Sequence, residues 1–422
     1  MKGISILLIT VTLLAGIAGC GDGGGGVEYD LTITSTEGGE VTSPGEGTSS
    51  YDEETEVSLV ATAEEEYYFV KWTGDVDTVD DADAIETTIT MSDNYSIAAN
   101  FVPDGAEPVW DWHDLDAIRD NLGASYLLMN DLDSATAGYI ELAGTTANDG
   151  KGWQPIGMWD ELAEQFFHGI FDGQGYEICD LFINRPDEVT GGLFGCVVVG
   201  GVIEHLGVVN ADVTGGTGVG SLVGINGGTV SSSYATAVIN GNYAVGGLVG
   251  LISGHDAAAE YGLPEYFGNG TVSKSYSTCS VSGNTFIGGL VGLNGGPVSN
   301  CYATGSVSGN SSVGGLVGEN GSGTVSNSYS TGSVTGNLSV GGLVSNDNGI
   351  VTNSFWDTET SGQTTSDGGT GKTTTEMQDI TTFSGATWDI IAVASPDIRN
   401  TSYIWNIVDD VTYPFLSWEP VS

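Results

Sequence analysis

The pentapeptide Gly314-Gly315-Leu316-Val317-Gly318 decides the fold of this 422-residue chain, because close copies of it recur along the second half of the sequence. In each copy two small residues, Gly-Gly or once Gly-Ser, precede a central leucine. These leucines are Leu193, Leu222, Leu248, Leu290, Leu316 and Leu343. They are separated by 26 to 29 residues, apart from one interval of 42. A period in this range indicates stacked units that share one elongated core.

Other positions recur together with the leucine. A Gly-Asn pair, which is typical of tight turns with positive φ, begins seven residues before four of the leucines. An aromatic residue follows most of them by about twelve residues, as Tyr234, Tyr302, Tyr329 and Phe355 do. The segments between are rich in Val, Thr, Ser and Tyr and lack a helical apolar stripe. Each unit therefore suits one coil of a parallel β-helix, whereas a disordered Gly/Ser-rich segment would lack the periodic apolar residues.

The repeats resemble the GLUG motif, which occurs in bacterial surface and secreted proteins. The resemblance rests on the Gly-Leu-apolar-Gly core and on Gly-Thr-Val-Ser-Asn-Ser-Tyr-Ser-Thr-Gly at Gly323–Gly332, and it covers about Gly191–Trp356. It implies an all-β fold, a right-handed parallel β-helix (solenoid), over residues 109–356. The zinc peptidases that carry such repeats have a His-Glu-x-x-His motif, which none of the four histidines here forms.

The N-terminus resembles a lipoprotein signal peptide. Residues 1–19 contain Lys2 and an apolar stretch, and Ile17-Ala18-Gly19-Cys20 matches a lipobox. An ordinary cleaved signal or a short membrane anchor is the alternative. We predict that Cys20 carries a lipid that attaches the protein to an extracytoplasmic membrane surface, with the Gly-rich residues 20–27 as a flexible tether.

Residues 28–102 resemble a divergent internalin-type B-repeat, which implies a small β-grasp-like domain of bacterial surface proteins. The resemblance rests on Tyr68–Asp75 and on Ile97–Phe101. Glu54 stands where that family usually has glycine, which puts one turn in doubt. We predict that the aromatic residues Phe69, Trp72 and Phe101 form the core of this domain rather than a ligand stack.

Both ends of an open solenoid need closure, because exposed edge strands promote aggregation. After a linker at Pro103–Pro108, we predict a short N-terminal cap helix over Asp111–Leu122 that covers the first coil with one apolar face. Residues 357–422 depart from the repeat and contain Trp388, Trp405 and Trp418. We predict that this segment is the C-terminal cap. An aromatic, carbohydrate-binding cluster is the alternative.

The composition is strongly acidic, with 8 Lys plus Arg against 55 Asp plus Glu and a net charge of −47. This charge excludes nonspecific binding of nucleic acid. A solvated surface is the default interpretation, and low-affinity binding of divalent cations is the alternative. No EF-hand or repeated Gly-Gly-x-Gly-x-Asp spacing occurs, and the sequence predicts neither a metal site nor a cofactor. Repeat alignment places Cys196, Cys279 and Cys301 in packing positions, while Cys179 stays unassigned.

Some parallel β-helices are polysaccharide lyases or glycosidases, so an enzyme is the main alternative function. A lyase needs a basic residue, and the arginines are Arg119, Arg185 and Arg399. A glycosidase needs two nearby carboxylates, for which Asp172 and Asp180 are candidates. No complete catalytic motif is present, and we predict no catalytic residues.

The 42-residue interval contains an insertion within Leu251–Asn269, which we expect to form a surface loop. Its candidate ligand-binding residues are His255, Asp256, Tyr261, Glu265, Tyr266 and Phe267, with the three aromatic residues partly exposed. A neutral insertion packed on the stack is the alternative. The sequence as a whole predicts a noncatalytic adhesion or binding protein for glycan, matrix or another surface protein. A polysaccharide-active enzyme and a structural envelope component are the alternatives.

Overall fold

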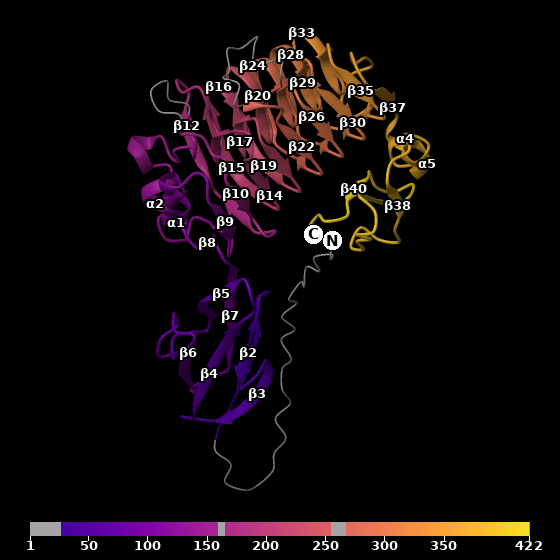
Figure 1. The fold of residues 1–422 in the computed structure, drawn as a ribbon. Coiled ribbons are helices and arrows are strands. Elements are labelled where there is room, and N and C mark those ends of the chain that lie inside the picture. The colour runs from indigo at the N-terminus through magenta and orange to yellow at the C-terminus, as the bar shows by residue number, and fades with distance from the viewer. Residues whose placement is uncertain (1–26, 159–164, 255–266, 422) are drawn as a thin grey trace. The chain divides into compact units, whose positions relative to one another are not determined.

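The computed structural model describes residues 27–158, 165–254 and 267–421. The chain divides into two compact units, Met1–Asp104 and Gly105–Ser422, and each is described by itself. Most of the described residues of both units lie in strands and turns (Figure 1).

The first unit consists of two small sheets around one core. One sheet has the order β3-β1-β7-β5 and the other β2-β4-β6. The strands are β1 (Glu28–Ser35), β2 (Gly39–Ser43), β3 (Gly47–Asp52), β4 (Glu56–Ala63), β5 (Tyr67–Gly74), β6 (Glu86–Thr90) and β7 (Tyr95–Pro103). Trp72 and Phe101 are buried, and Phe69 packs against them, as predicted. Glu54 has a φ of 65°, which is the left-handed conformation that favours glycine at this turn.

The second unit is a parallel β-helix whose coils contribute in turn to three sheets (Figure 1). The first sheet contains β8 (Ala106–Val109), β9 (Ser125–Leu128), β10 (Ile170–Asp172), β14 (Val202–Glu204), β18 (Thr229–Ser231), β22 (Thr271–Ser273), β26 (Pro297–Ser299), β30 (Thr324–Ser326) and β35 (Ile350–Thr352). The second contains β13 (Phe194–Val197), β17 (Val223–Asn226), β21 (Val249–Ile252), β25 (Val291–Asn294), β29 (Val317–Asn320) and β34 (Val344–Asp347).

The third and largest sheet completes each coil. Its strands are β11 (Glu177–Cys179), β12 (Phe182–Arg185), β15 (Gly207–Gly215), β16 (Thr217–Val219), β19 (Tyr234–Asn240), β20 (Tyr243–Gly246), β23 (Tyr276–Ser277), β24 (Ser280–Gly288), β27 (Tyr302–Ala303), β28 (Val307–Gly314), β31 (Tyr329–Ser330), β32 (Val334–Thr335), β33 (Leu338–Gly341), β36 (Phe355–Asp357) and β37 (Thr370–Lys372). Equivalent residues of successive coils pair in register, as Tyr276 does with Tyr302 and Val281 with Val307.

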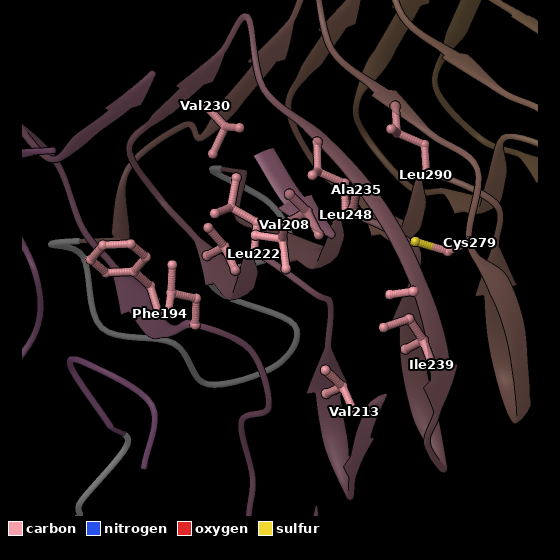
Figure 2. Packing of buried hydrophobic residues seen from close by; sticks show 14 of the residues in the cluster. Phe194, Val208, Val213, Leu222, Val230, Ala235, Ile239, Leu248, Cys279 and Leu290 are labelled. Atoms are coloured by element: carbon pink, nitrogen blue, oxygen red, sulfur yellow. The ribbon is translucent and has the colours of Figure 1, made fainter. Parts of the chain in front are cut away.

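The repeated leucines are the core of the stack, as predicted. All six are 0% exposed and belong to one apolar cluster that runs through the coils. Figure 2 shows part of this cluster, with Leu222, Leu248 and Leu290 from successive coils. The three sheets supply the remaining core residues, among them Phe194, Val230 and Ile239. The predicted parallel β-helix is confirmed.

The glycine pair before each leucine is explained by close approach between coils. A Cβ atom on Gly247 would lie 2.2 Å from the carbonyl oxygen of Gly289, and one on Gly289 would lie 2.2 Å from that of Gly315. Both distances are far inside van der Waals contact. At this corner glycine lets successive coils stack at the strand spacing of about 4.8 Å, and the one serine, Ser221, is accepted with its Oγ donating to the Gly247 carbonyl at 2.6 Å.

The interpretation of the Gly-Asn pairs as positive-φ turns is wrong. The left-handed residue lies two positions after each asparagine, at Ala244, Phe286, Ser312 and Ser339, with φ between 49° and 60°. The asparagines instead bond to one another along the stack. Asn284 Nδ2 donates to Asn242 Oδ1 at 3.3 Å, and Asn337 Nδ2 donates to Asn310 Oδ1 at 2.9 Å.

The N-terminal end of the solenoid is closed by a helix that is shorter than predicted. Asp111 caps α1 (Trp112–Ala117), which continues as the 3-10 helix η1 (Ile118–Asp120). Leu115 and Ile118 are buried in the solenoid core. Two further short helices follow, α2 (Tyr139–Leu142) and η2 (Ala147–Gly150). The linker predicted at Pro103–Pro108 is wrong in its second half, because β8 pairs with β9 as the first strand of the solenoid.

The chain beyond the last repeat covers both an end and a side of the stack. Up to Lys372 it lies over the final coil, where Ser366 Oγ accepts from the N–H of Val344 at 2.9 Å and β37 pairs with β36. The rest forms α4 (Thr374–Met377), α5 (Ile380–Ser384), β38 (Ile390–Ala392), β39 (Trp405–Ile407) and β40 (Phe415–Leu416). We call residues 373–421 the C-terminal cover. It packs against the outer side of the largest sheet, not only against the end of the solenoid.

Candidate functional site

The predicted ligand loop lies almost wholly outside the described residues. The candidates that fall between the described residues 254 and 267 are His255, Asp256, Tyr261, Glu265 and Tyr266. Phe267 is the one candidate that the structure describes. Phe267 is 0% exposed, so the prediction of a partly exposed ring is wrong for this residue.

Phe267 packs instead on the outer face of the six-stranded sheet. Its ring centroid lies 5.3 Å from that of Phe166, and both belong to a side cluster with Ile225, Leu251 and Leu293. The outward positions of this sheet are apolar in the central coils. An aromatic side chain is therefore buried on this face, whereas a polar face would leave it exposed. Cys20, the predicted lipid attachment site, also lies outside the described residues.

The recurring tyrosines form a stacked column on the outside of the largest sheet. Ring centroids are 4.9 Å apart between Tyr234 and Tyr276, 4.8 Å between Tyr276 and Tyr302, and 5.0 Å between Tyr302 and Tyr329. The interplanar angles are 11°, 3° and 6° in the same order. This column would suit the planar faces of sugar rings, but its members are at most 8% exposed.

The C-terminal cover buries the column, and one tryptophan packs against each pair of neighbouring tyrosines. The Trp418 centroid is 6.2 Å from Tyr234 and 5.9 Å from Tyr276. Trp405 lies 6.1 Å from Tyr302 and 5.9 Å from Tyr329. The tryptophans considered as a carbohydrate-binding cluster are therefore packed against the repeat, with Trp388 5% and Trp405 0% exposed.

Two carboxylates fasten the cover, the buried Asp357 and the half-buried Glu419. Glu419 Oε1 accepts from Tyr302 Oη at 2.9 Å, and burial raises the pKa of Glu419 to about 7 despite that bond and a bond from the Leu416 N–H. Asp357 accepts from Tyr413 Oη and from Thr374 Oγ1, each at 2.7 Å. Burial opposes ionisation of Asp357, but these hydrogen bonds hold its pKa below the ordinary value.

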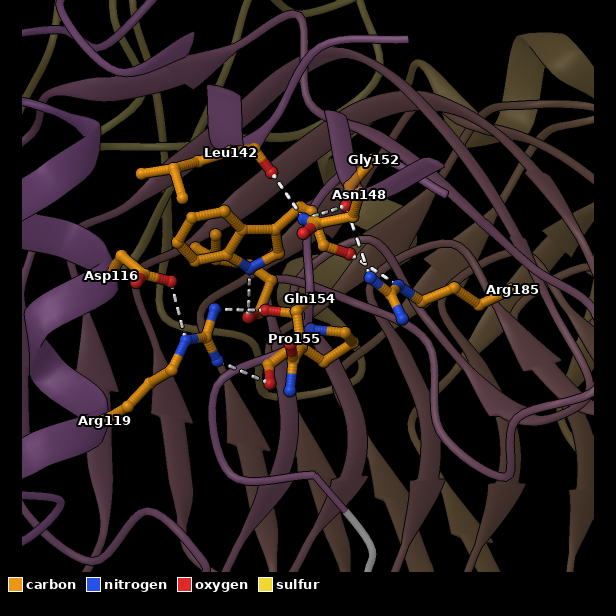
Figure 3. A network of polar contacts seen from close by, with 10 residues as sticks. Asp116, Arg119, Leu142, Asn148, Gly152, Gln154, Pro155 and Arg185 are labelled. Carbon is orange, nitrogen blue, oxygen red and sulfur yellow. Dashed lines mark hydrogen bonds and ion pairs between the residues drawn. The ribbon is translucent and has the colours of Figure 1, made fainter. Parts of the chain in front are cut away.

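The arginines considered for a lyase all bind backbone carbonyl groups. Figure 3 shows Arg119 and Arg185. Arg119 donates to the Pro155 carbonyl at 2.8 Å and to that of Gln154, and it pairs with Asp116 at 2.7 Å. Arg185 donates to the Trp153 carbonyl at 2.9 Å. Arg399 donates to the carbonyl of Glu419 at 3.0 Å. Guanidinium groups held in this way fasten loops, and in its charged form the group has donors but no lone pair that could accept a proton.

The structure does not bring Asp172 and Asp180 together as a glycosidase pair. Asp172 ends β10 in the nine-stranded sheet, whereas Asp180 follows β11 in the largest sheet. Asp180 accepts from Asn210 Nδ2 at 2.6 Å, and its hydrogen bonds with Ser134 and Asn210 lower its pKa. It lines an open depression of about 370 Å³ together with Tyr139, Asn210 and Asp212.

Asp172 is instead part of a cluster that sequence reasoning missed. Strands β10 and β14 pair in register, which places Asp172 beside Glu204. His205 Nδ1 lies 3.1 Å from Asp172 Oδ1, and this hydrogen bond raises the pKa of His205. One ligand atom from each of the three residues lies within 4.8 Å of the others. Phe171-Asp172 and Ile203-Glu204 share one pattern, an inward aromatic or apolar residue followed by an acid. This pattern could have revealed that Asp172 and Glu204 are neighbours.

The outer face of the nine-stranded sheet carries two files of uncharged side chains, which we call the hydroxyl strip because eight of its ten residues are Ser or Thr. In β18, β22, β26 and β30 the middle valine is buried, while the two flanking residues face outward. In-register pairing aligns them along the stack. The hydroxyl strip consists of Thr229, Ser231, Thr271, Ser273, Pro297, Ser299, Thr324, Ser326, Ile350 and Thr352.

The remaining cysteines are not reactive sites. Cys196, Cys279 and Cys301 are buried and unpaired, in agreement with their predicted packing positions. Burial raises the pKa of the Cys301 thiol to about 12 and that of Cys279 to about 11. The half-buried Cys179 also has its pKa raised to about 12, by burial and by the nearby Glu177. Thiols with such pKa values are poor nucleophiles and metal ligands.

Two of these regions match known protein families. The divergent InlB B-repeat domain matches residues 29–105. The GLUG motif matches residues 283–308 and 309–335. Both resemblances predicted from the sequence are confirmed over these residues.

Two curated relatives share part of the chain. Halomucin of Haloquadratum walsbyi is 35% identical over 170 residues, which are 39% of this chain and 2% of that protein. A putative Gly-rich membrane protein of Evansella cellulosilytica is 34% identical over 123 residues, which are 28% of this chain and 13% of that protein. The chain thus spans a small fraction of either relative's length.

Among solved structures, IgA1 protease covers 72% of this chain and 22% of its own, with 15% identity and a TM-score of 0.32. At that score the likeness carries no conclusion about function. In the part of the chain that the structure describes, no helix has the length and apolar character of a membrane span.

Proposed function

We propose that this protein is a noncatalytic, lipid-anchored surface protein that binds an extended, uncharged glycan along the hydroxyl strip. The observation that carries the proposal is the regular array of outward Ser and Thr side chains on the nine-stranded sheet. The matches to the B-repeat and GLUG families, and the membrane protein among the relatives, support a place at a cell surface.

The spacing of the strip suits a repeating polymer. Parallel in-register strands place equivalent hydroxyl groups about 4.8 Å apart along the stack, and alternate residues of one strand roughly 6.6 Å apart across it. Each hydroxyl is both a donor and an acceptor, as are the hydroxyl groups of sugars. Many weak bonds of this kind, repeated along one polymer, give avidity without a deep pocket.

The charge of the chain favours a neutral ligand. With a net charge of −47, the protein repels polyanions, and the strip from β18 to β35 carries no charged side chain. The aromatic column is buried under the C-terminal cover, so it supports a binding role less well than the strip does. The cavities lined by Arg119 and by Asp180 are small or open.

The test compares two serines in the same coil. Ser273→Glu places a charge in the middle of the hydroxyl strip, and Ser280→Glu places the same charge at an exposed position of the largest sheet. We expect Ser273→Glu to abolish binding on an array of neutral glycans and to insoluble polysaccharides, and Ser280→Glu to bind like the wild type. Equal binding by all three proteins would contradict the proposal. Release of reducing sugar by the wild type would establish the enzyme alternative instead.

A further inference from the structure

The cluster of Asp172, Glu204 and His205 directly precedes Ser231 and Ser273, the first serines of one file of the hydroxyl strip. Register pairing fixes it, because Asp172 pairs with Glu204 and Glu204 with Ser231. His205 is the next residue and has a φ of 52°. Its N–H donates to the Ser231 carbonyl at 3.3 Å, and its own carbonyl accepts from Gly175 at 2.7 Å. The solenoid backbone therefore holds the three side chains at one point.

The donor set distinguishes this cluster from the many surface carboxylates of the chain. Two carboxylates and an imidazole offer oxygen and nitrogen ligands, which suit Zn²⁺ and related transition-metal ions, whereas Ca²⁺ and Mg²⁺ favour all-oxygen sites. Zinc bonds of about 2.0–2.2 Å place tetrahedral ligand atoms roughly 3.4 Å apart. His205 Nδ1 and Asp172 Oδ1 are already 3.1 Å apart.

The third ligand is available. Glu204 is half-buried, and its carboxylate makes no hydrogen bond or ion pair with any residue that the structure describes. All three candidate atoms lie within 4.8 Å of one another, so a rotation of the Glu204 side chain closes the set. His205 and Asp172 are also half-exposed, which leaves a fourth position open to solvent.

We propose that Asp172, Glu204 and His205 bind one divalent transition-metal ion of the Zn²⁺ class, with water as the remaining ligand. The ion binds the neutral imidazole through Nδ1, so protonated His205 releases its Nδ1 proton to solvent, whereas a neutral ring with its proton on Nδ1 exchanges it through solvent for a proton on Nε2. The site lies on β10 and β14 of the nine-stranded sheet, two strands in from the β8 edge, and is independent of whether the hydroxyl strip binds a glycan.

The repeat itself supplies the variants for the test. The next three coils hold Ser232, Lys274 and Asn300 at the position of His205, with φ of 47°, 49° and 54°. His205→Asn therefore removes the imidazole and keeps a residue that the ladder accepts. In the wild type the Gln174 N–H donates to Asp172 Oδ1 at 2.8 Å. Asp172→Asn removes one charge and keeps an acceptor for this N–H. His113→Asn is the control, because His113 lies 3.7 Å from a single carboxylate, that of Asp111.

Zn²⁺ binding to the full chain is measured by calorimetry at roughly 0.5 M NaCl, which screens the net charge. We expect one tight equivalent in the wild type and in His113→Asn. In His205→Asn and Asp172→Asn the affinity should fall by at least about tenfold. Retention of the tight equivalent in His205→Asn, or its loss in His113→Asn, would overturn the assignment. Ca²⁺ that competes as well as Zn²⁺ would also overturn it.

A second measurement needs no variant. Co²⁺ added at one equivalent should shift or broaden the ring signals of one of the four histidines in the NMR spectrum of the wild type. Broadening of all four signals, or of none, would exclude a single site at His205.

Discussion

Truncation of one core leucine tests whether the repeat is stabilised as a stack. Leu316 is 0% exposed, and its N–H and carbonyl groups bond to Leu343 and Leu290 at 2.9 Å each. Leu316→Ala leaves a cavity that neither neighbouring coil can fill, because backbone pairing fixes their distance. The expected cost is about 3–5 kcal/mol, the upper part of the range for buried leucines.

The assay is differential scanning calorimetry of the solenoid transition. An unfolding entropy of roughly 2.1 cal/mol/K per residue gives about 0.7 kcal/mol/K for Gly105–Ser422, so the cost lowers Tm by roughly 4 to 8 °C. Leu338→Ala is the matched control, because this leucine belongs to the next coil and is 62% exposed. Its Tm should change by less than about 1 °C. Equal melting temperatures for the two variants would refute the idea that the leucine slot is the core.

Two other predictions concern the ends of the chain. Because burial raises the folded-state pKa of Glu419 to about 7 from a model-compound value of 4.5, its stabilising contribution is fully present below about pH 4.5 and is lost as pH rises through 7. Urea unfolding at a series of pH values should show this loss in the wild type and not in Glu419→Gln, and an unchanged profile in the variant would contradict the assignment. Cys20→Ala should move the protein from the membrane fraction to a soluble or unprocessed form, and the same detergent partitioning as the wild type would exclude lipidation.

The sequence was sufficient for those parts of the fold that repeat. The leucine slot, the strand positions and the tyrosine slot each recur at a fixed distance, so one coil predicts the next. The B-repeat core was also predictable, because the resemblance to that family implies a core for Phe69, Trp72 and Phe101. Strand alternation alone would place Phe69 and Trp72 on opposite faces, but the register of β5 shifts between Phe69 and Lys71. The positive-φ turn of each coil was predicted at the Gly-Asn pair, which is the wrong residue, because the position with positive φ does not need glycine. Ala244 and Phe286 accept positive φ where the stack dictates it.

The remaining features depend on contacts between distant segments. The tryptophans of the C-terminal cover were recognised, but nothing in their local sequence shows that Trp418 contacts Tyr234, which is 184 residues earlier. The Asp172 cluster depends on the register of an early coil that precedes the clear repeats, so Glu204 was not connected with it. Phe267 was expected outside because an insertion suggests a loop, whereas the apolar outer face near Leu251 binds its ring.

The C-terminal cover sets how many tyrosines of the column can be buried. It continues from the last coil, and its tryptophans reach back along the column as far as Tyr234, which Trp418 contacts. A further tyrosine-bearing coil would lengthen the column by about 4.8 Å at its N-terminal end, beyond Trp418, and would expose one more ring. The insertion in the 42-residue interval has no such effect, since Tyr234 and Tyr276 on either side of it remain 4.9 Å apart. Lengthening of a single coil therefore leaves the cover matched to the column, whereas duplication of a whole coil leaves one tyrosine uncovered.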